Sequence, residues 1–396
     1  MTTFFFRRSV EKAFQLDELP SGLTLHPLKP LKADPPHITS AVDDIMYIVN
    51  KVLQQSLATS QLSVVMNVVP TLSRVLGSDF IGMTQRKMRD ECYPRAAVQG
   101  VQPPESLVIS FLVLINNLDV AVEYIQRIVA KNTESTQTIA NADSHPELIS
   151  QLESLFPATE QAKQVAQSLQ TLSSSFEGKV TDLLSDGIQV IFNNVVKHRL
   201  RPILADAFRD IEYQPRETDY TNTDDPFSPT EDDYPDYTTT DNTNNYSSGA
   251  ELVCPRFTTA WSDLLLPLSR LMTPTAFDKL LTLTTTYLAR LLEKRLWSYH
   301  ARVNPLGATR LERDVSGIVN AAVDVAASVP GAGGISGGRY KHRETFGRCL
   351  QIVLVMGMDE EEWEDVVRGG EMVEVVDKLS GEERARVRGM VNRRIY

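Results

Sequence analysis

The segment from residue 107 to residue 129 constrains the fold more than any other part of this sequence. Its apolar residues recur every three or four positions, which places them on one helix face: Leu107, Phe111, Leu114, Leu118, Val122, Ile125 and Val129. The longest unbroken apolar run, residues 111–115, is far shorter than the ~18 residues of a membrane span, and Asn116 and Asn117 follow it directly. The segment therefore predicts a helix that packs against other helices and does not cross a membrane.

The same spacing recurs along most of the chain. It predicts further helices at residues 42–57, 62–76, 147–196, 261–271, 273–297 and 311–327. Thr39 or Ser40 is expected to cap the first of these helices and Thr273 the fifth, and Pro70 is expected to kink or end the second. Because the alternation typical of strands is sparse, the sequence predicts an all-α fold.

The domain organisation is predicted from length and from proline and glycine punctuation. With 396 residues, the chain exceeds the ~250–300 residues at which single cores stop growing. We expect a partial helical bundle at 1–103, a main bundle at 105–341 and a small C-terminal helical bundle at 343–396, after the glycine-rich joint VPGAGGISGG. The acidic, Thr-rich insert at 213–251 is too polar to bury a core and is predicted to be disordered.

Composition and motifs argue against most chemical functions. The net charge of −11 disfavours nucleic-acid binding, and the scattered Cys92, Cys254 and Cys349 are typical of reduced core residues. The glycine-rich joint lacks the lysine spacing of a phosphate-binding loop, and the six histidines form no metal-binding motif. We therefore assign no catalytic residue, no cofactor and no metal, although an active site assembled from distant residues stays open.

Four blocks of the sequence resemble a known family. They are FFRRSVEKAFQLDE near the start, AVDDIMYIVNKVLQQSLATS at 41–60, SFLVLINNLDVAVEYIQRI at 110–128 and RETFGRCLQIVLVMGMDEEE at 343–362. In this order they are similar to landmarks of the fourth subunit of the conserved oligomeric Golgi complex. The resemblance covers nearly the whole chain but corresponds to the C-terminal half of a usual member, so residues 1–103 are expected to lie at a truncated edge.

The resemblance implies an elongated stack of helical bundles without an active site. Its expected function is that of a non-catalytic subunit of a Golgi vesicle-tethering complex in retrograde intra-Golgi transport. The expected partners are the other subunits and membrane-fusion proteins, with peripheral association at the cytosolic face of the Golgi membrane. Two alternatives stay open: a helical scaffold of another tethering complex, such as exocyst, and an all-α enzyme or exchange factor.

At the level of single residues, the sequence singles out Arg348. A helix is predicted at 343–357, with one apolar stripe that includes Phe346 and Val353 and a second that follows Arg348. A helix apolar on both sides predicts a partly buried guanidinium that needs a carboxylate, unless the side chain reaches water. The resemblance implies a pair with Glu383. Glu383 can also form a capping box with Ser380, a role that competes with the pairing. Asp359 followed by Glu362 predicts a second capping box.

Overall fold

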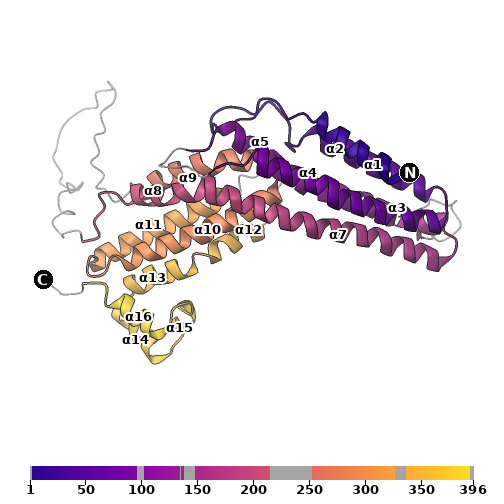
Figure 1. The fold of residues 1–396 in the computed structure, drawn as a ribbon. Helices are drawn as coiled ribbons and strands as arrows, with labels where there is room; N and C mark the ends of the chain where they lie inside the picture. Colours follow the sequence, from indigo (N-terminus) through magenta and orange to yellow (C-terminus); the bar gives the residue numbers. More distant parts are fainter. Residues whose placement is uncertain are drawn as a thin grey trace, which may run out of the picture. The chain divides into compact units, whose positions relative to one another are not determined.

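The structure, a computed structural model, describes residues 2–95, 102–133, 135–137, 148–214, 252–325 and 336–392. These residues form an all-α fold, as predicted, with one two-stranded antiparallel ladder, β1 (Ser135–Gln137) with β2 (Leu148–Ser150). The chain divides into two compact units (Figure 1). The first holds residues 1–198, 264–283 and 328–332, and the second holds 199–263, 284–327 and 333–396.

The first unit is built from long helices and three π-helical turns. The elements are α1 (Thr2–Gln15), α2 (Ser40–Leu57), α3 (Leu62–Val75), η1 (Leu76–Phe80), α4 (Ile81–Arg86), η2 (Lys87–Glu91), α5 (Glu105–Thr133), α6 (Gln151–Leu155), α7 (Thr159–Ile191) and η4 (Phe192–Val196). Helix α7 packs against α5 and α3, and α2 packs against α1, α3 and α5. The helical run that begins at Leu62 continues through Pro70 to Glu91, so Pro70 marks no boundary.

Helix α5 forms the centre of this unit, as its apolar spacing predicts. Every side chain from Phe111 to Leu118 is buried, including those of Asn116 and Asn117. By length and composition, Leu62–Glu91 and Glu105–Thr133 could each cross a membrane. In the most apolar window of Glu105–Thr133, 67% of the residues are buried inside the protein. A helix at the centre of a protein core has this burial, which agrees with packing as the role of α5.

The second unit contains shorter helices. The elements are α8 (Lys197–Ala207), α9 (Val253–Leu271), α10 (Pro274–Trp297), α11 (Pro305–Asp324), α12 (Ser336–Glu344), α13 (Gly347–Gly357), α14 (Glu360–Arg368), α15 (Met372–Val375) and α16 (Gly381–Arg388). The first residues of α8 and parts of α9 and α10 belong to the first unit. Helix α11 buries its predicted stripe, from Leu311 to Val325, and packs against α12 and α13. Helix α13 also packs against α16.

Several predicted boundaries differ from the observed ones. Helix α5 packs on α2 and α7 within the first unit and α13 packs on α11 within the second, while the division of the chain into three bundles stays a prediction. The helix predicted at 343–357 is interrupted at Thr345 and Phe346, so α13 begins at Gly347. Helix α9 begins eight residues before the predicted Trp261.

The predicted insert at 213–251 begins too early. Tyr213 is buried, with 2% of its surface exposed, and its hydroxyl donates to a carboxylate oxygen of Asp314 at 2.8 Å. Its carbonyl oxygen accepts from the amide of Asn304 at 3.0 Å. Residues 215–251, the rest of the predicted insert, lie outside the described residues, as do residues 329–335 of the glycine-rich joint. Tyr213 is therefore part of the core of the second unit.

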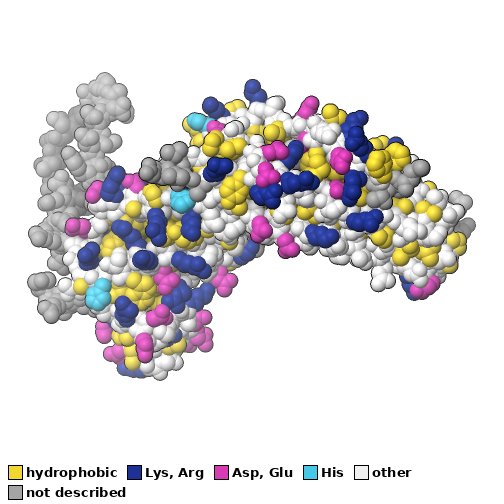
Figure 2. All heavy atoms as spheres, in the orientation of Figure 1, with side chains coloured by type: hydrophobic (Ala, Val, Ile, Leu, Met, Phe, Trp, Pro, Cys, Tyr) yellow, Lys and Arg dark blue, Asp and Glu magenta, His cyan; other side chains and the backbone are white. Residues whose placement is uncertain are grey.

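Charged side chains of both signs are interspersed with apolar ones on the face that Figure 2 draws. The three cysteines are free, Cys349 being buried and Cys92 and Cys254 half-buried. In the described part of the chain, no three His, Cys, Asp or Glu side chains are arranged to hold a metal ion.

Candidate functional site

The structure brings the two predicted residues, Arg348 and Glu383, together in the second unit. Nη2 of Arg348, on α13, donates to Oε1 of Glu383, on α16, at 2.7 Å. The same guanidinium donates from Nη2 and Nε to Oε1 of Glu293, on α10, at 2.9 and 3.1 Å. Its Nη1 donates to the carbonyl oxygen of Lys378 at 2.8 Å. One arginine thus joins three helices and a loop, and we call these four residues the Arg348 cluster.

The Arg348 cluster is neither fully buried nor fully exposed. The side chains of Arg348, Glu383 and Glu293 expose 38%, 34% and 25% of their surface. Hydrogen bonds to Glu383 and Glu293 raise the pKa of Arg348, so it stays charged at any physiological pH. The hydrogen bond from Arg348, with a second from the Ser380 amide, lowers the pKa of Glu383 to about 2. The pair is therefore ionised, and water screens part of its attraction.

Glu383 performs both of the roles between which the sequence left a choice. While its Oε1 accepts from Arg348, its Oε2 accepts from the backbone amide of Ser380 at 2.8 Å. The hydroxyl of Ser380 in turn accepts from the amide of Glu383 at 3.3 Å. One carboxylate oxygen therefore serves the ion pair and the other serves the capping box, so Glu383 links the start of α16 to α13. The second predicted capping box, Asp359 with Glu362, is also present.

Sequence reasoning missed Glu293 and Lys378. Glu293 lies in a leucine-rich helix where a carboxylate usually faces solvent, and no local pattern connects it with a residue 55 positions away. The carbonyl of Lys378 is a backbone group, so its residue type carries no signal. Only the packing of α13 on its neighbours places these acceptors around Arg348.

The thiol next to Arg348 has no reactive character. Cys349 is 1% exposed, and its Sγ donates to the carbonyl oxygen of Ala289 at 3.4 Å. Burial raises its pKa to about 12, so the nucleophilic thiolate is scarce at neutral pH. This environment fits a packing role for Cys349, and the acceptors of the Arg348 cluster bind the guanidinium of Arg348.

A second group of polar residues that sequence reasoning missed lies in the first unit. Nδ2 of Asn116 donates to the carbonyl oxygens of His37 and Leu271, at 3.0 and 2.7 Å, and its Oδ1 accepts from the amide of Thr273 at 3.0 Å. Asn117 exchanges two hydrogen bonds of 2.9 Å with Thr39. The neighbouring asparagines of α5 thus fasten the chain just before α2 and just before α10. Their role is structural.

Comparisons with known proteins agree with the resemblance in the sequence. Residues 111–386 match the family described as "Conserved oligomeric Golgi complex subunit 4, C-terminal", and residues 1–88 match "COG4 transport protein, middle alpha-helical bundle". The two matches follow one another along the chain and leave only a short gap between them.

Relatives in several kingdoms carry the name Conserved oligomeric Golgi complex subunit 4. The Arabidopsis thaliana protein is 26% identical over 80% of this chain, the Saccharomyces cerevisiae protein 26% identical over 53%, and the Mus musculus protein 21% identical over 91%. The matched regions cover 35%, 22% and 40% of those three proteins. This chain therefore spans less than half the length of the relatives that it matches.

A solved structure shares the fold. The crystal structure of the C-terminal domain of the exocyst subunit Sec6p is similar over 99% of this chain and 83% of that domain, with a TM-score of 0.52 and 14% sequence identity. At that identity the likeness concerns the fold alone. Because the family match covers most of the sequence, the chain belongs to the family of conserved oligomeric Golgi complex subunit 4.

Proposed function

We propose that this chain is a non-catalytic part of a Golgi vesicle-tethering complex and acts in retrograde intra-Golgi transport. It would do so by binding other subunits and membrane-fusion proteins at the cytosolic face of the Golgi membrane. The observation that carries this proposal is the match of residues 1–88 and 111–386 to two consecutive regions of one family. The relatives' names describe a complex subunit, and binding is the activity such a role requires.

The Arg348 cluster supports this proposal through the helices that it joins. It is formed by side chains from α10, α13 and α16 and by a loop carbonyl, and it stabilises the arrangement of those helices. We propose that Arg348 and Glu383 maintain the C-terminal helices in the shape that partners bind. The cluster's own hydrogen bonds use four of the five N–H donors of Arg348, so most of the guanidinium's bonding capacity is spent inside the cluster.

The proposal is tested by affinity purification of the tagged protein from cells of its own source, with identification of the co-purified proteins. We expect the other subunits of the Golgi complex and membrane-fusion proteins. An Arg348→Ala variant should retain fewer of these partners, whereas Arg368→Ala, a matched change at an exposed ion pair of α14, should retain them all. Recovery of exocyst subunits without Golgi subunits would contradict the proposal, and so would recovery of no complex at all.

A further inference from the structure

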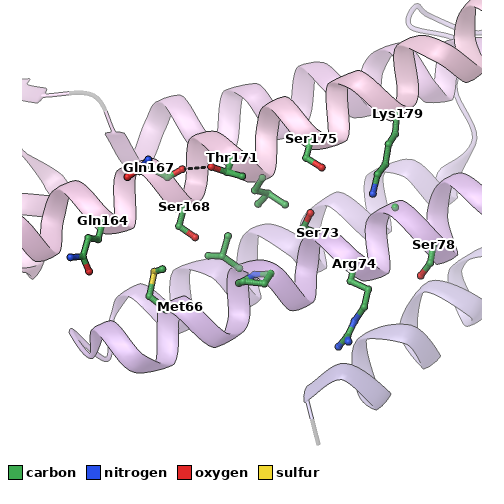
Figure 3. A pocket seen from close by; sticks show the side chains of 14 residues that line it. Met66, Ser73, Arg74, Ser78, Gln164, Gln167, Ser168, Thr171, Ser175 and Lys179 are labelled. Atoms are coloured by element: carbon green, nitrogen blue, oxygen red, sulfur yellow. Dashed lines mark hydrogen bonds between the residues drawn. The ribbon is translucent and has the colours of Figure 1, made fainter.

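A groove of about 740 Å³ runs between α3 and α7 of the first unit. Val69 and Leu172, each 2% exposed, form an apolar floor. Figure 3 shows Met66 and Gln164 at one end of the groove and Lys179 at the other, where it extends from α7 toward α3. The groove thus has an apolar end and a basic end.

The basic end carries uncompensated positive charge. No Asp or Glu is among the groove's lining residues in the described part of the chain, whereas Arg74 and Lys179 both line it. Among the described residues neither cation forms an ion pair. Asp79, on the adjoining turn, is already paired with Arg7 at 3.1 Å. A local excess of positive charge in a chain of net charge −11 favours an anionic ligand.

The ammonium of Lys179 lies against the helix at Gly77. A Cβ atom at Gly77 would lie 2.8 Å from Nζ of Lys179, and the end of this flexible side chain could move away from it. Gly77 also lies in the π-helical turn η1, a rare local geometry that recurs at functional sites.

We propose that this groove binds a short extended peptide of a partner protein, with an apolar residue near Met66 and acidic residues near Lys179. From Met66 to Ser78 the helix rises by roughly 18 Å, because each helical residue adds ~1.5 Å. An extended peptide covers that length with about five or six residues. The exposed thioether of Met66, 41% exposed, offers an adaptable apolar contact at the far end.

The walls of the groove suit a peptide better than an isolated anion. Between the two ends, hydroxyl and amide side chains line the walls, including Ser73, Gln167, Ser168 and Ser175. Such groups both donate and accept hydrogen bonds, which the backbone of an extended peptide requires. A phosphate or lipid headgroup would use only the basic end. The peptide uses the apolar floor, the polar walls and both cations.

The experiment measures binding of fluorescent hexapeptides to the purified 396-residue chain by fluorescence anisotropy. The probes are Leu-Ser-Ser-Thr-Glu-Glu and the same sequence reversed, because the direction of the bound peptide is open. The comparison peptides carry glutamine in place of glutamate. We expect at least one acidic probe to bind about tenfold more tightly than its glutamine counterpart. Its affinity should fall as salt is added.

Charge-reversal variants locate the binding site. Lys179→Glu should lower the affinity for the acidic probe by about tenfold or more, and Arg74→Glu should also lower this affinity. The matched control is Lys163→Glu, the same change at an exposed lysine of α7 outside the groove; it should leave the affinity unchanged. Because Lys163 and Lys179 are both exposed, the variants should keep the thermal unfolding temperature of the parent chain.

Three results would overturn the proposal. The first is equal binding of glutamate and glutamine probes, and the second is an equal loss of affinity in Lys163→Glu and Lys179→Glu. The third is that no peptide binds, while the parent chain binds phosphatidylserine vesicles and Lys179→Glu does not. That result would identify a lipid surface as the ligand. The proposal goes beyond the proposed function, and its failure would leave co-purification with Golgi subunits unaffected.

Discussion

At the scale of single residues, the side-chain caps that the sequence predicts for α2 and α10 are not formed, and Asn116 and Asn117 bind the residues just before these helices. Thr39 precedes α2 without capping it, because its hydroxyl accepts from Asn117 and Asp17 takes the amide of Ala41 instead. The hydroxyl of Thr273 is buried without a hydrogen-bond partner, while its amide donates to Asn116. The capping predictions at Thr39 or Ser40 and at Thr273 were therefore wrong. Asparagines of a different helix accept from the amides of Thr39 and Thr273 themselves, whereas Asp17 accepts from the amide that a cap of α2 would serve.

Replacing Asn116 by alanine should destabilise the first unit by about 3 kcal/mol or more. The change leaves two buried carbonyls and one buried amide without their partner, and each such group costs ~1–3 kcal/mol when it is not rescued by water. Denaturant unfolding should show the loss. The matched control is Asn67→Ala on the exposed surface of α3, where the amide only bonds within its own helix; it should change stability by less than about 0.5 kcal/mol.

Replacing Arg348 by alanine should destabilise the second unit by about 1–2 kcal/mol. This lies between the ~3–5 kcal/mol of a buried broken pair and the ~0.2–1 of an exposed one, because the side chains are about one-third exposed. Unfolding of Arg348→Ala, Glu383→Ala and the double variant measures the coupling. Additive effects would show that the two side chains do not stabilise one another. Arg368→Ala, at a more exposed pair, should change stability by no more than about 0.5 kcal/mol.

Glu383 makes the free energy of unfolding of the second unit depend on pH in the acid range. Its pKa of about 2 in the folded protein lies below the usual 4.5, so folding favours the ionised form. The resulting stability is fully present above about pH 4.5 and is lost as the pH falls toward about 2. In Glu383→Gln, the decline over this range should be shallower. Urea unfolding at a series of pH values measures both slopes, and identical slopes would contradict this role for Glu383.

At the scale of elements, the first turn of α11 is held against residues 208–214, which follow α8. Asn304 caps α11 by accepting from the amide of Gly307 at 2.7 Å, and Pro305 occupies the first helical position. A Cβ atom at Gly307 would lie 1.8 Å from the carbonyl oxygen of Tyr213. Glycine is required here because two backbone segments approach one another closely. The geometry of α11 alone would accept any residue that favours a helix.

Gly307→Ala should destabilise the protein by about 2 kcal/mol or more, although alanine usually stabilises a helix by ~0.5–1 kcal/mol relative to glycine. The clash is with a backbone atom, so a rotation of a flexible side chain does not relieve it. The control is Gly178→Ala in α7, where nothing lies within 4 Å of the added carbon; it should stabilise by ~0.5–1 kcal/mol. Thermal unfolding of both variants should show shifts of opposite sign.

At the scale of the whole molecule, the division into two units predicts that a destabilising substitution in one unit mainly loosens that unit. The Asn116 contacts lie within the first unit and the Arg348 cluster within the second. Amide hydrogen exchange of Asn116→Ala should therefore rise mainly in the described residues of the first unit, 2–95, 102–133, 135–137, 148–198 and 264–283. That of Arg348→Ala should rise mainly in those of the second unit, 199–214, 252–263, 284–325 and 336–392. The stability losses of the double variant should add within about 0.5 kcal/mol. Equal exchange in both units for either variant would contradict this division.

The sequence by itself determined the all-α fold, the burial of α5 and α11 and the capping boxes at Asp359 and Ser380. These features depend on residues three or four positions apart, so periodicity and local hydrogen bonding suffice to predict them. It also indicated the family and the pairing of Arg348 with Glu383, because four blocks occur in the family's order.

Tertiary structure alone decided the features that join distant residues. It placed Glu293 beside Arg348, set Asn116 and Asn117 against the starts of two other helices, buried Tyr213 and brought Gly307 against its carbonyl. It also set the limits of the two units, since those follow from which helices pack together. The physical reason is the same in each case: buried polar groups and close backbone contacts are satisfied by whichever atoms packing brings near, and sequence distance carries no information about them.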